Sequence, residues 1–172
     1  MKNLLIVVDM QNDFIDQALG TEEAVKTVPE VVGLILDPAF DQVIATKDTH
    51  HEDYLQTLEG KMLPVTHCVE NTEGWQINPD VEAALEKRSA LVITKGTFGS
   101  ERLASMVKEM KPEKITLCGL CTDICVISNG LLLRAALPDT PIEAVSAACA
   151  GTTKENHEAA LAVMRSCQID IR

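Results

Sequence analysis

The chain has 172 residues, of which 46% are hydrophobic, enough for the sizeable core of one domain spanning residues 1–172. Its net charge of −11 disfavours nucleic acid or an anionic membrane surface as a partner. No run of about 18 apolar residues could span a bilayer. Six cysteines without an export signal suggest reduced thiols and a cytoplasmic protein.

The first part of the chain predicts a strand, a helix and a second strand. Residues 4–8 form an apolar run typical of a strand buried on both faces of a parallel sheet, and Asp9 follows at its carboxyl end. Thr21 begins a helix with apolar residues at helical spacing, and Pro29 should kink or divide it. Residues 42–46 predict the second strand.

Residues 48–78 show no clean periodicity, and such a long connection inside a compact domain is usually functional. Asp48 and His50 are two residues apart at a strand end, so both side chains can point the same way. With His67 they form a set of oxygen and nitrogen donors that suits zinc, iron or manganese. The alternative is a solvated acidic loop with incidental histidines, which the spacing alone favours.

The second part of the chain continues the alternation of strands and helices. Asn78 is expected to cap a helix, a strand over 91–94 ends at Lys95, and Ser100 caps the next helix. A further strand is expected over 142–145, followed by a final helix. This order predicts an α/β fold, a three-layer αβα sandwich with a mainly parallel central sheet.

Between these elements lies a cysteine-rich segment. Residues 115–118 predict a buried strand, Gly119 a tight turn, and Thr122 or Asp123 the cap of a helix. Cys125 falls in the first helical turn, where free N–H groups and the helix dipole favour an anion, so we expect a shift toward thiolate. The alternative, equally weighted on this segment alone, is that its cysteines are small buried hydrophobic residues.

Three unusual residues, Asp9, Lys95 and Cys125, are placed by this prediction at one edge of a parallel sheet. A carboxylate can take the proton of a thiol, and an ammonium favours the ionised form of both. Backbone N–H groups from Cys121 to Cys125 could then hold an oxyanion.

Five segments, spread over most of the chain, jointly resemble the isochorismatase-like cysteine hydrolases, which include nicotinamidases. They are residues 5–14, 45–50, 58–69, 93–96 and 118–126. The resemblance implies that Asp9, Lys95 and Cys125 are catalytic, that a cis peptide precedes Cys121, and that N–H groups of Cys121 and Cys125 bind the oxyanion. It implies hydrolysis of a small amide through a thioester, with nicotinamide to nicotinate plus ammonia as the leading reaction.

The resemblance also implies a divalent metal beside the nucleophile, with zinc as the leading candidate and iron or manganese as alternatives. Its ligands would be Asp48, His50, Glu59 and His67. The chain has no later histidine where many nicotinamidases carry one, and a variant known in the family uses a glutamate instead, so Glu59 is expected ahead of Asp53. Phe14 and Phe98, with Tyr54 as an alternative, are expected to contact the substrate ring, and the family's habit suggests a homo-oligomer.

Other functions remain open at this stage. Within the same fold, the substrate could be another small amide or the vinyl ether of isochorismate. Cys118 and Cys121 form a C-x-x-C pair that could serve a thiol–disulfide oxidoreductase, although Cys118 is expected inside a strand. A zinc site on Cys118, Cys121 and Cys125 lacks a second pair of ligands. An inactive binding module is the remaining alternative.

Overall fold

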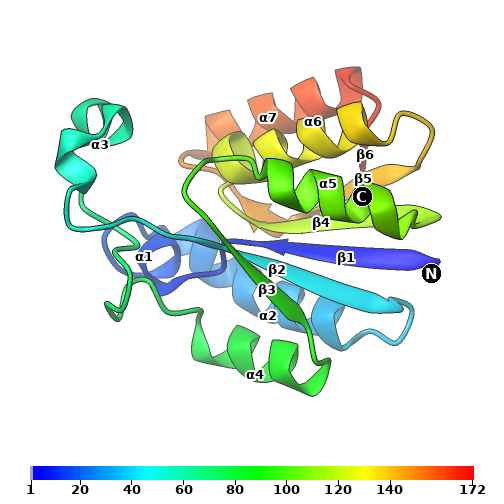
Figure 1. Ribbon diagram of the computed structural model, residues 1–172, viewed down its shortest axis with the longest axis horizontal. Coiled ribbons are helices and arrows are strands. Elements are labelled where there is room, and N and C mark those ends of the chain that lie inside the picture. Colours follow the sequence, from blue (N-terminus) through cyan, green and yellow to red (C-terminus); the bar gives the residue numbers. More distant parts are fainter. Residues whose placement is uncertain (1) are drawn as a thin grey trace.

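A computed structural model describes residues 2–172, in which six parallel strands form one sheet in the order β3-β2-β1-β4-β5-β6 (Figure 1). The strands are β1 (Asn3–Val8), β2 (Gln42–Asp48), β3 (Leu91–Lys95), β4 (Lys114–Leu120), β5 (Ile142–Ala150) and β6 (Asp170–Ile171). β1 and β4 pair at the centre of the sheet along the whole length of β1. The predicted α/β class is confirmed, and the sheet is parallel throughout.

Helices cover both faces of the sheet and complete the three predicted layers (Figure 1). On one face lie α2 (Glu22–Leu36) and α4 (Pro79–Lys87), and on the other lie α5 (Glu101–Met110), α6 (Ile127–Ala136) and α7 (Lys154–Ser166). The short helices are α1 (Asn12–Ile15), η1 (Tyr54–Gln56), α3 (Leu58–Met62) and the single π-helical turn η2 (Thr122–Val126). Since helices bury both faces, the central strands are apolar in succession, and residues 4–8 are at most 1% exposed.

Three of the predicted helix caps form as expected. Side-chain oxygens of Thr21, Asn78 and Ser100 accept hydrogen bonds from backbone N–H groups in the first turns of α2, α4 and α5. Pro29 does not divide α2, which is continuous over its 15 residues. One missing N–H bond is tolerated because the helix buries an apolar face against the core.

The predicted turn at Gly119 is wrong, because β4 continues through Gly119 to Leu120. Glycine is needed there for a different reason. Its φ is +115°, and a Cβ atom would lie 2.1 Å from the carbonyl oxygen of Val8 on the neighbouring strand. The residue therefore allows the two central strands to approach each other where both reach the functional edge.

The predicted caps of the cysteine-bearing helix are also wrong. Cys121 occupies the cap position without a side-chain hydrogen bond. The Thr122 hydroxyl is instead 2.8 Å from Nδ1 of His157, and the Asp123 carboxylate accepts from N and Oγ1 of Thr152 at 2.8 and 2.6 Å. Both side chains thus tie η2 to α7 and the segment before it, which are distant in sequence.

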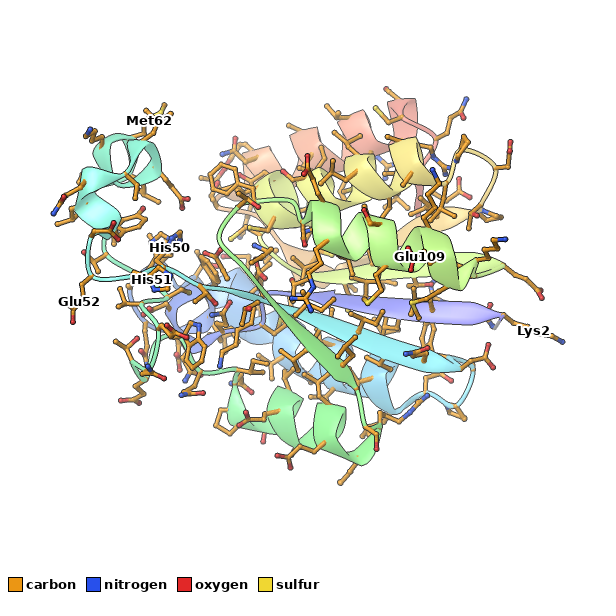
Figure 2. All side chains as sticks on the ribbon, viewed as in Figure 1. Lys2, His50, His51, Glu52, Met62 and Glu109 are labelled. Carbon is orange, nitrogen blue, oxygen red and sulfur yellow. The ribbon has the colours of Figure 1, made fainter. Side chains whose placement is uncertain are left out.

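The aperiodic segment between β2 and α4 contains η1 and α3, which are too short to give a periodic pattern. Figure 1 shows α3 projecting from the layered body, and Figure 2 shows His50 at the base of this projection, with Met62 at its far end. Two isolated bridges anchor the segment, His50 with Val69 and Gln11 with Ile77. Within residues 2–172, no helix has both the length and the apolar character needed to cross a membrane.

Candidate active site

Four polar side chains gather at the carboxyl edge of the sheet. Asp9 follows β1, Asp48 and Lys95 are the last residues of β2 and β3, and Cys125 lies in η2 directly after β4. Asp48 and Lys95 are paired opposite each other in neighbouring strands. The structure therefore brings together residues separated by more than 100 positions, as the parallel arrangement predicts.

Lys95 is the common contact of this group. Its Nζ lies 2.6 Å from Oδ2 of Asp9, 3.4 Å from Oδ1 of Asp48 and 3.5 Å from Sγ of Cys125. It also donates to the carbonyl oxygen of Thr97 at 3.0 Å. The ammonium thus links a carboxylate and a thiol that are both buried.

Electrostatics differ from one member of the group to the next. Burial opposes the charge on Lys95, but Asp9 and the other anionic neighbours outweigh it and raise the pKa of Lys95 further. Burial raises the pKa of Asp9, against the lowering effect of Lys95. Burial and the nearby Asp9 raise the pKa of the Cys125 thiol well above its ordinary value. The expected shift toward thiolate is therefore wrong, because burial and the Asp9 carboxylate outweigh the Lys95 ammonium.

The peptide bond between Leu120 and Cys121 is cis, as the family resemblance implied. It lies between the end of β4 and η2, the turn that carries Cys125. The backbone of Cys121 and the nucleophile candidate Cys125 thereby belong to one short segment.

A second group of donors lies next to the first. Nε2 of His50 is 3.0 Å from Oδ2 of Asp48 and 3.5 Å from Oε1 of Glu59. Nε2 of His67 lies 3.9 Å from the same Asp48 oxygen and 3.7 Å from the same Glu59 oxygen. Ligands of a tetrahedral zinc ion, each about 2.0–2.1 Å from it, are roughly 3.3 Å apart. The observed spacings are therefore close to those of a four-ligand metal centre.

The chemistry of the donors also fits a cation. Nδ1 of His67 lies 2.8 Å from the carbonyl oxygen of Val65. When Nδ1 carries the proton and donates this hydrogen bond, the lone pair of Nε2 is free to bind a metal ion. Nε2 of His50 is buried without a well-formed hydrogen bond among residues 2–172. Burial disfavours a charged His50, but Asp48 and Glu59 outweigh it and raise the pKa of His50 to about 9. Asp48, His50 and His67 could hold a metal ion, with Glu59 adjacent.

The two alternatives for the fourth position are distinguished by geometry. Asp53 is exposed in the turn before η1, whereas Glu59 lies in α3 with an oxygen facing both histidines. His51 is also exposed and lies 3.6 Å from Glu70, away from the donor group. Glu59 is therefore the residue that the structure brings to the histidines.

The family model of the isochorismatase domain matches residues 3–171 of the chain. The chain belongs to the isochorismatase family. It is 29% identical over 203 aligned residues to a nicotinamidase from Schizosaccharomyces pombe, with 97% of this chain and 91% of that protein covered. The family match and this relative place the converging residues in a hydrolase family.

Solved structures of the family agree with this assignment. A nicotinamidase/pyrazinamidase from Bacillus subtilis superposes with a TM-score of 0.84 at 25% identity, covering 99% of both chains. A pyrazinamidase from Pyrococcus horikoshii in complex with zinc gives a TM-score of 0.81 at 26% identity, covering 100% of this chain and 99% of that one. The similarity thus extends over the whole isochorismatase fold.

In this isochorismatase-family protein, aromatic rings surround the two histidines. The ring centroid of Phe14 lies 5.4 Å from that of His67, and the ring of Tyr54 lies 4.7 and 5.0 Å from those of His50 and His67. Phe98, in contrast, is 46% exposed in the connection between β3 and α5. Phe14 and Tyr54 therefore line the donor group, while a substrate contact of Phe98 stays a prediction.

The redox and cysteine–zinc alternatives receive no support from the geometry. Cys118 is fully buried within β4, whereas a redox pair needs an exposed attacking thiol. All six cysteines are free. Among residues 2–172, the tight group of potential metal ligands contains no cysteine.

Sequence reasoning missed three polar residues of the site. The Thr46 hydroxyl donates to Oδ1 of Asp9 at 2.7 Å, and the buried side chains of Gln11 and Asp13 bond to the backbone around the metal-ligand candidates. The available signal was that Gln11 and Asp13 closely follow Asp9 after an apolar strand, at the edge where open α/β sheets place their ligand sites.

Proposed function

We propose that the protein is a metal-assisted cysteine amidohydrolase whose leading reaction converts nicotinamide and water to nicotinate and ammonia. The observation that carries the proposal is the Lys95 ammonium, in contact with both Asp9 and Cys125 and with Asp48 of the adjacent donor group. The nicotinamidase from S. pombe and the nicotinamidase/pyrazinamidase from B. subtilis support the choice of substrate.

In the first half of the reaction, the carboxylate of Asp9 takes the proton of the Cys125 thiol. Sγ attacks the carboxamide carbon, and the carbonyl oxygen becomes an oxyanion. The C–N bond then breaks, and the proton held by Asp9 leaves with the amino group as ammonia. A thioester remains on Cys125. Burial and Asp9 raise the pKa of the Cys125 thiol, so the attack needs a base beside it, and the Lys95 ammonium contacts both Asp9 and Cys125.

In the second half, Asp9 takes a proton from a water molecule whose oxygen attacks the thioester carbon. The C–S bond breaks, the carboxylic acid leaves, and the proton returns to Cys125. The N–H groups of Cys121 and Cys125 are proposed to stabilise the oxyanion in both halves. This role is supported by the position of both residues in one short segment, since Cys121 directly precedes η2, which carries Cys125.

We further propose that Asp48, His50, Glu59 and His67 hold a zinc ion. Bound there, a divalent cation would supply a Lewis acid able to hold the pyridine nitrogen of the substrate and to polarise water. Phe14 is proposed to contact the pyridine ring, since it already lies against His67, and Phe98 to contact it from the β3–α5 connection. The zinc complex of the P. horikoshii pyrazinamidase supports zinc over iron or manganese.

Ammonia release from nicotinamide tests the reaction, with Cys125→Ala and Cys121→Ala as a matched pair. Cys125→Ala is expected to abolish turnover with an unchanged urea-unfolding curve, while Cys121→Ala keeps it, because only its backbone is used. Equal loss in both variants would contradict the choice of nucleophile. If the zinc-loaded wild type releases ammonia from another small amide but not from nicotinamide, the proposed hydrolase activity stands and the proposed substrate is wrong.

Metal content tests the donor group separately. His67→Ala is expected to lower bound zinc and turnover together, while His51→Ala, a change at an exposed histidine 3.6 Å from Glu70, leaves both unchanged. Chelation should reduce turnover, and added zinc should restore it. A fully active preparation free of metal would remove the cation from the mechanism.

We also propose that residues 1–172 act as one hydrolase domain that assembles into a homo-oligomer. Apolar side chains on the projecting α3 support assembly, because Leu58 and Met62 are 74% and 79% exposed (Figure 2). Light scattering coupled to size-exclusion chromatography measures the oligomeric state directly, and a monomer at all concentrations would contradict the proposed assembly.

A further inference from the structure

The five residues that leave β1 carry three polar side chains into the protein. Asp9 and Gln11 are fully buried, and Asp13 is 8% exposed. Asp9 has a φ of +46°, and its carbonyl oxygen accepts from the N–H of Gln11 at 2.8 Å, so the chain turns sharply at the end of the strand. Burying a polar side chain costs free energy unless it forms hydrogen bonds, and each of these three side chains has a different partner.

The side chain of Gln11 forms hydrogen bonds to β2 beyond the end of β1. The amide side chain binds both backbone groups of Asp48, accepting from its N–H at 2.7 Å and donating to its carbonyl oxygen at 2.8 Å. A second donation reaches the carbonyl oxygen of Trp75 at 2.9 Å. The last residues in register between the two strands are Val7 and Ala45. Gln11 therefore fixes the backbone of Asp48 three residues beyond the regular pairing.

Asp13 supports the backbone next to the two histidines of the metal-ligand set. Its Oδ2 accepts from the N–H of Cys68 at 2.7 Å, directly after His67, and Cys68 has a φ of +46°. The carbonyl oxygen of Cys68 in turn accepts from the N–H of His50 at 2.9 Å. The carboxylate is packed against Gly74, where any Cβ would lie 2.1 Å from it. One carboxylate thus supports the backbone from which both histidines project.

We propose that Gln11 and Asp13 are positioning residues for the metal centre, an inference that rests on the proposed metal-assisted function. Their hydrogen bonds end on backbone groups of Asp48 and Cys68, so they act through the ligands and not on the metal or the substrate. Ligands held by a second set of hydrogen bonds bind metal more tightly, and losing such a partner typically costs 10–100-fold in affinity. One short segment thereby sets the catalytic carboxylate and both halves of the metal site.

Zinc affinity of the apo-protein, measured by competition with a chromophoric chelator, tests the inference without any substrate. Gln11→Ala and Asp13→Ala should each lower the affinity by about 10–100-fold. Gln11→Glu should also lower it, because a carboxylate cannot donate to the carbonyl oxygens of Asp48 and Trp75. Asp13→Asn keeps an acceptor for the Cys68 N–H and should lie closer to wild type than Asp13→Ala.

The matched control is Asn12→Ala. Asn12 belongs to the same segment, but its side chain donates to the carbonyl oxygen of Glu73 at 2.9 Å and touches no ligand, so affinity should not change. Cobalt-substituted protein gives an independent readout, since the visible spectrum should shift in the Gln11 and Asp13 variants and not in Asn12→Ala.

Urea unfolding in chelator identifies variants that fail to fold, and Gln11→Glu, which preserves shape but loses both donated hydrogen bonds, then carries the test. Folded Gln11→Ala, Gln11→Glu and Asp13→Ala variants with wild-type zinc affinity and cobalt spectra would overturn the inference while leaving the proposed function intact. A wild type that binds no zinc would overturn the metal centre and this inference together. Failure of nicotinamide as the substrate would affect neither measurement.

Discussion

Replacing Lys95 by methionine removes an ammonium that faces two buried carboxylates. Its Nζ lies 2.6 Å from Oδ2 of Asp9 and 3.4 Å from Oδ1 of Asp48, and all three side chains are at most 6% exposed. Removing one partner of a buried ion pair costs about 3–5 kcal/mol, since the remaining charge has lost its compensation. For a chain of this length, such a loss lowers Tm by roughly 6–20 °C.

Urea unfolding at neutral pH, with chelator present, measures this effect. Lys95→Met should lower the midpoint without changing the slope. The double variant Lys95→Met/Asp9→Asn should recover part of the loss, because it removes the uncompensated charge. Lys154→Met, at an exposed ammonium 3.1 Å from Glu23, should leave the midpoint almost unchanged. The reasoning is refuted if Lys95→Met behaves like Lys154→Met, or if the double variant is no more stable than the single one.

Two further predictions concern stability. Burial raises the pKa of Glu143, but the Lys114 ammonium at 2.7 Å outweighs it and lowers this pKa, so the stabilisation is present above about pH 4.3 and lost as pH falls through the lowered value. The Tm difference between wild type and Glu143→Gln should therefore shrink in acid, and a constant difference would contradict the pairing. Gly119→Ala should destabilise by at least about 1–3 kcal/mol in urea unfolding, because of its positive φ and the contact with Val8. The matched change Gly33→Ala meets no atom within 4 Å and should stabilise α2; similar effects at both glycines would disprove the steric argument.

The layers and the catalytic edge could be predicted because their signals are local. Strands buried on both faces are apolar in succession, helix caps are single residues, and parallel strands bring their carboxyl ends together whatever the intervening sequence. Asp9 and Lys95 each follow a run of mostly apolar residues in the sequence, so their meeting required only the topology. The raised pKa of Cys125 was not predictable in the same way, because it depends on burial and on a carboxylate more than 100 residues away.

The metal-ligand candidates show where local signals end. Asp48 and His50 share a direction through extended backbone, but the position of Glu59 depends on α3, a five-residue helix without a detectable period. Only the resemblance to a family favoured Glu59 over Asp53. The role of Gly119 was misjudged because glycine marks both turns and close backbone approaches, and only the neighbouring strand distinguishes them.

The two oxygens of Asp48 face different partners, Oδ1 the ammonium of Lys95 and Oδ2 the ring of His50. One residue is thus shared by the nucleophilic and the metal-binding halves of the site. Mutational dissection must take this into account, since Asp48→Ala perturbs both halves at once and its phenotype cannot be apportioned between them. Cys125 and His67 are the positions at which the two halves are genetically separable. Among natural relatives, the same sharing predicts that a change at the position of Asp48 is accompanied by changes in both halves.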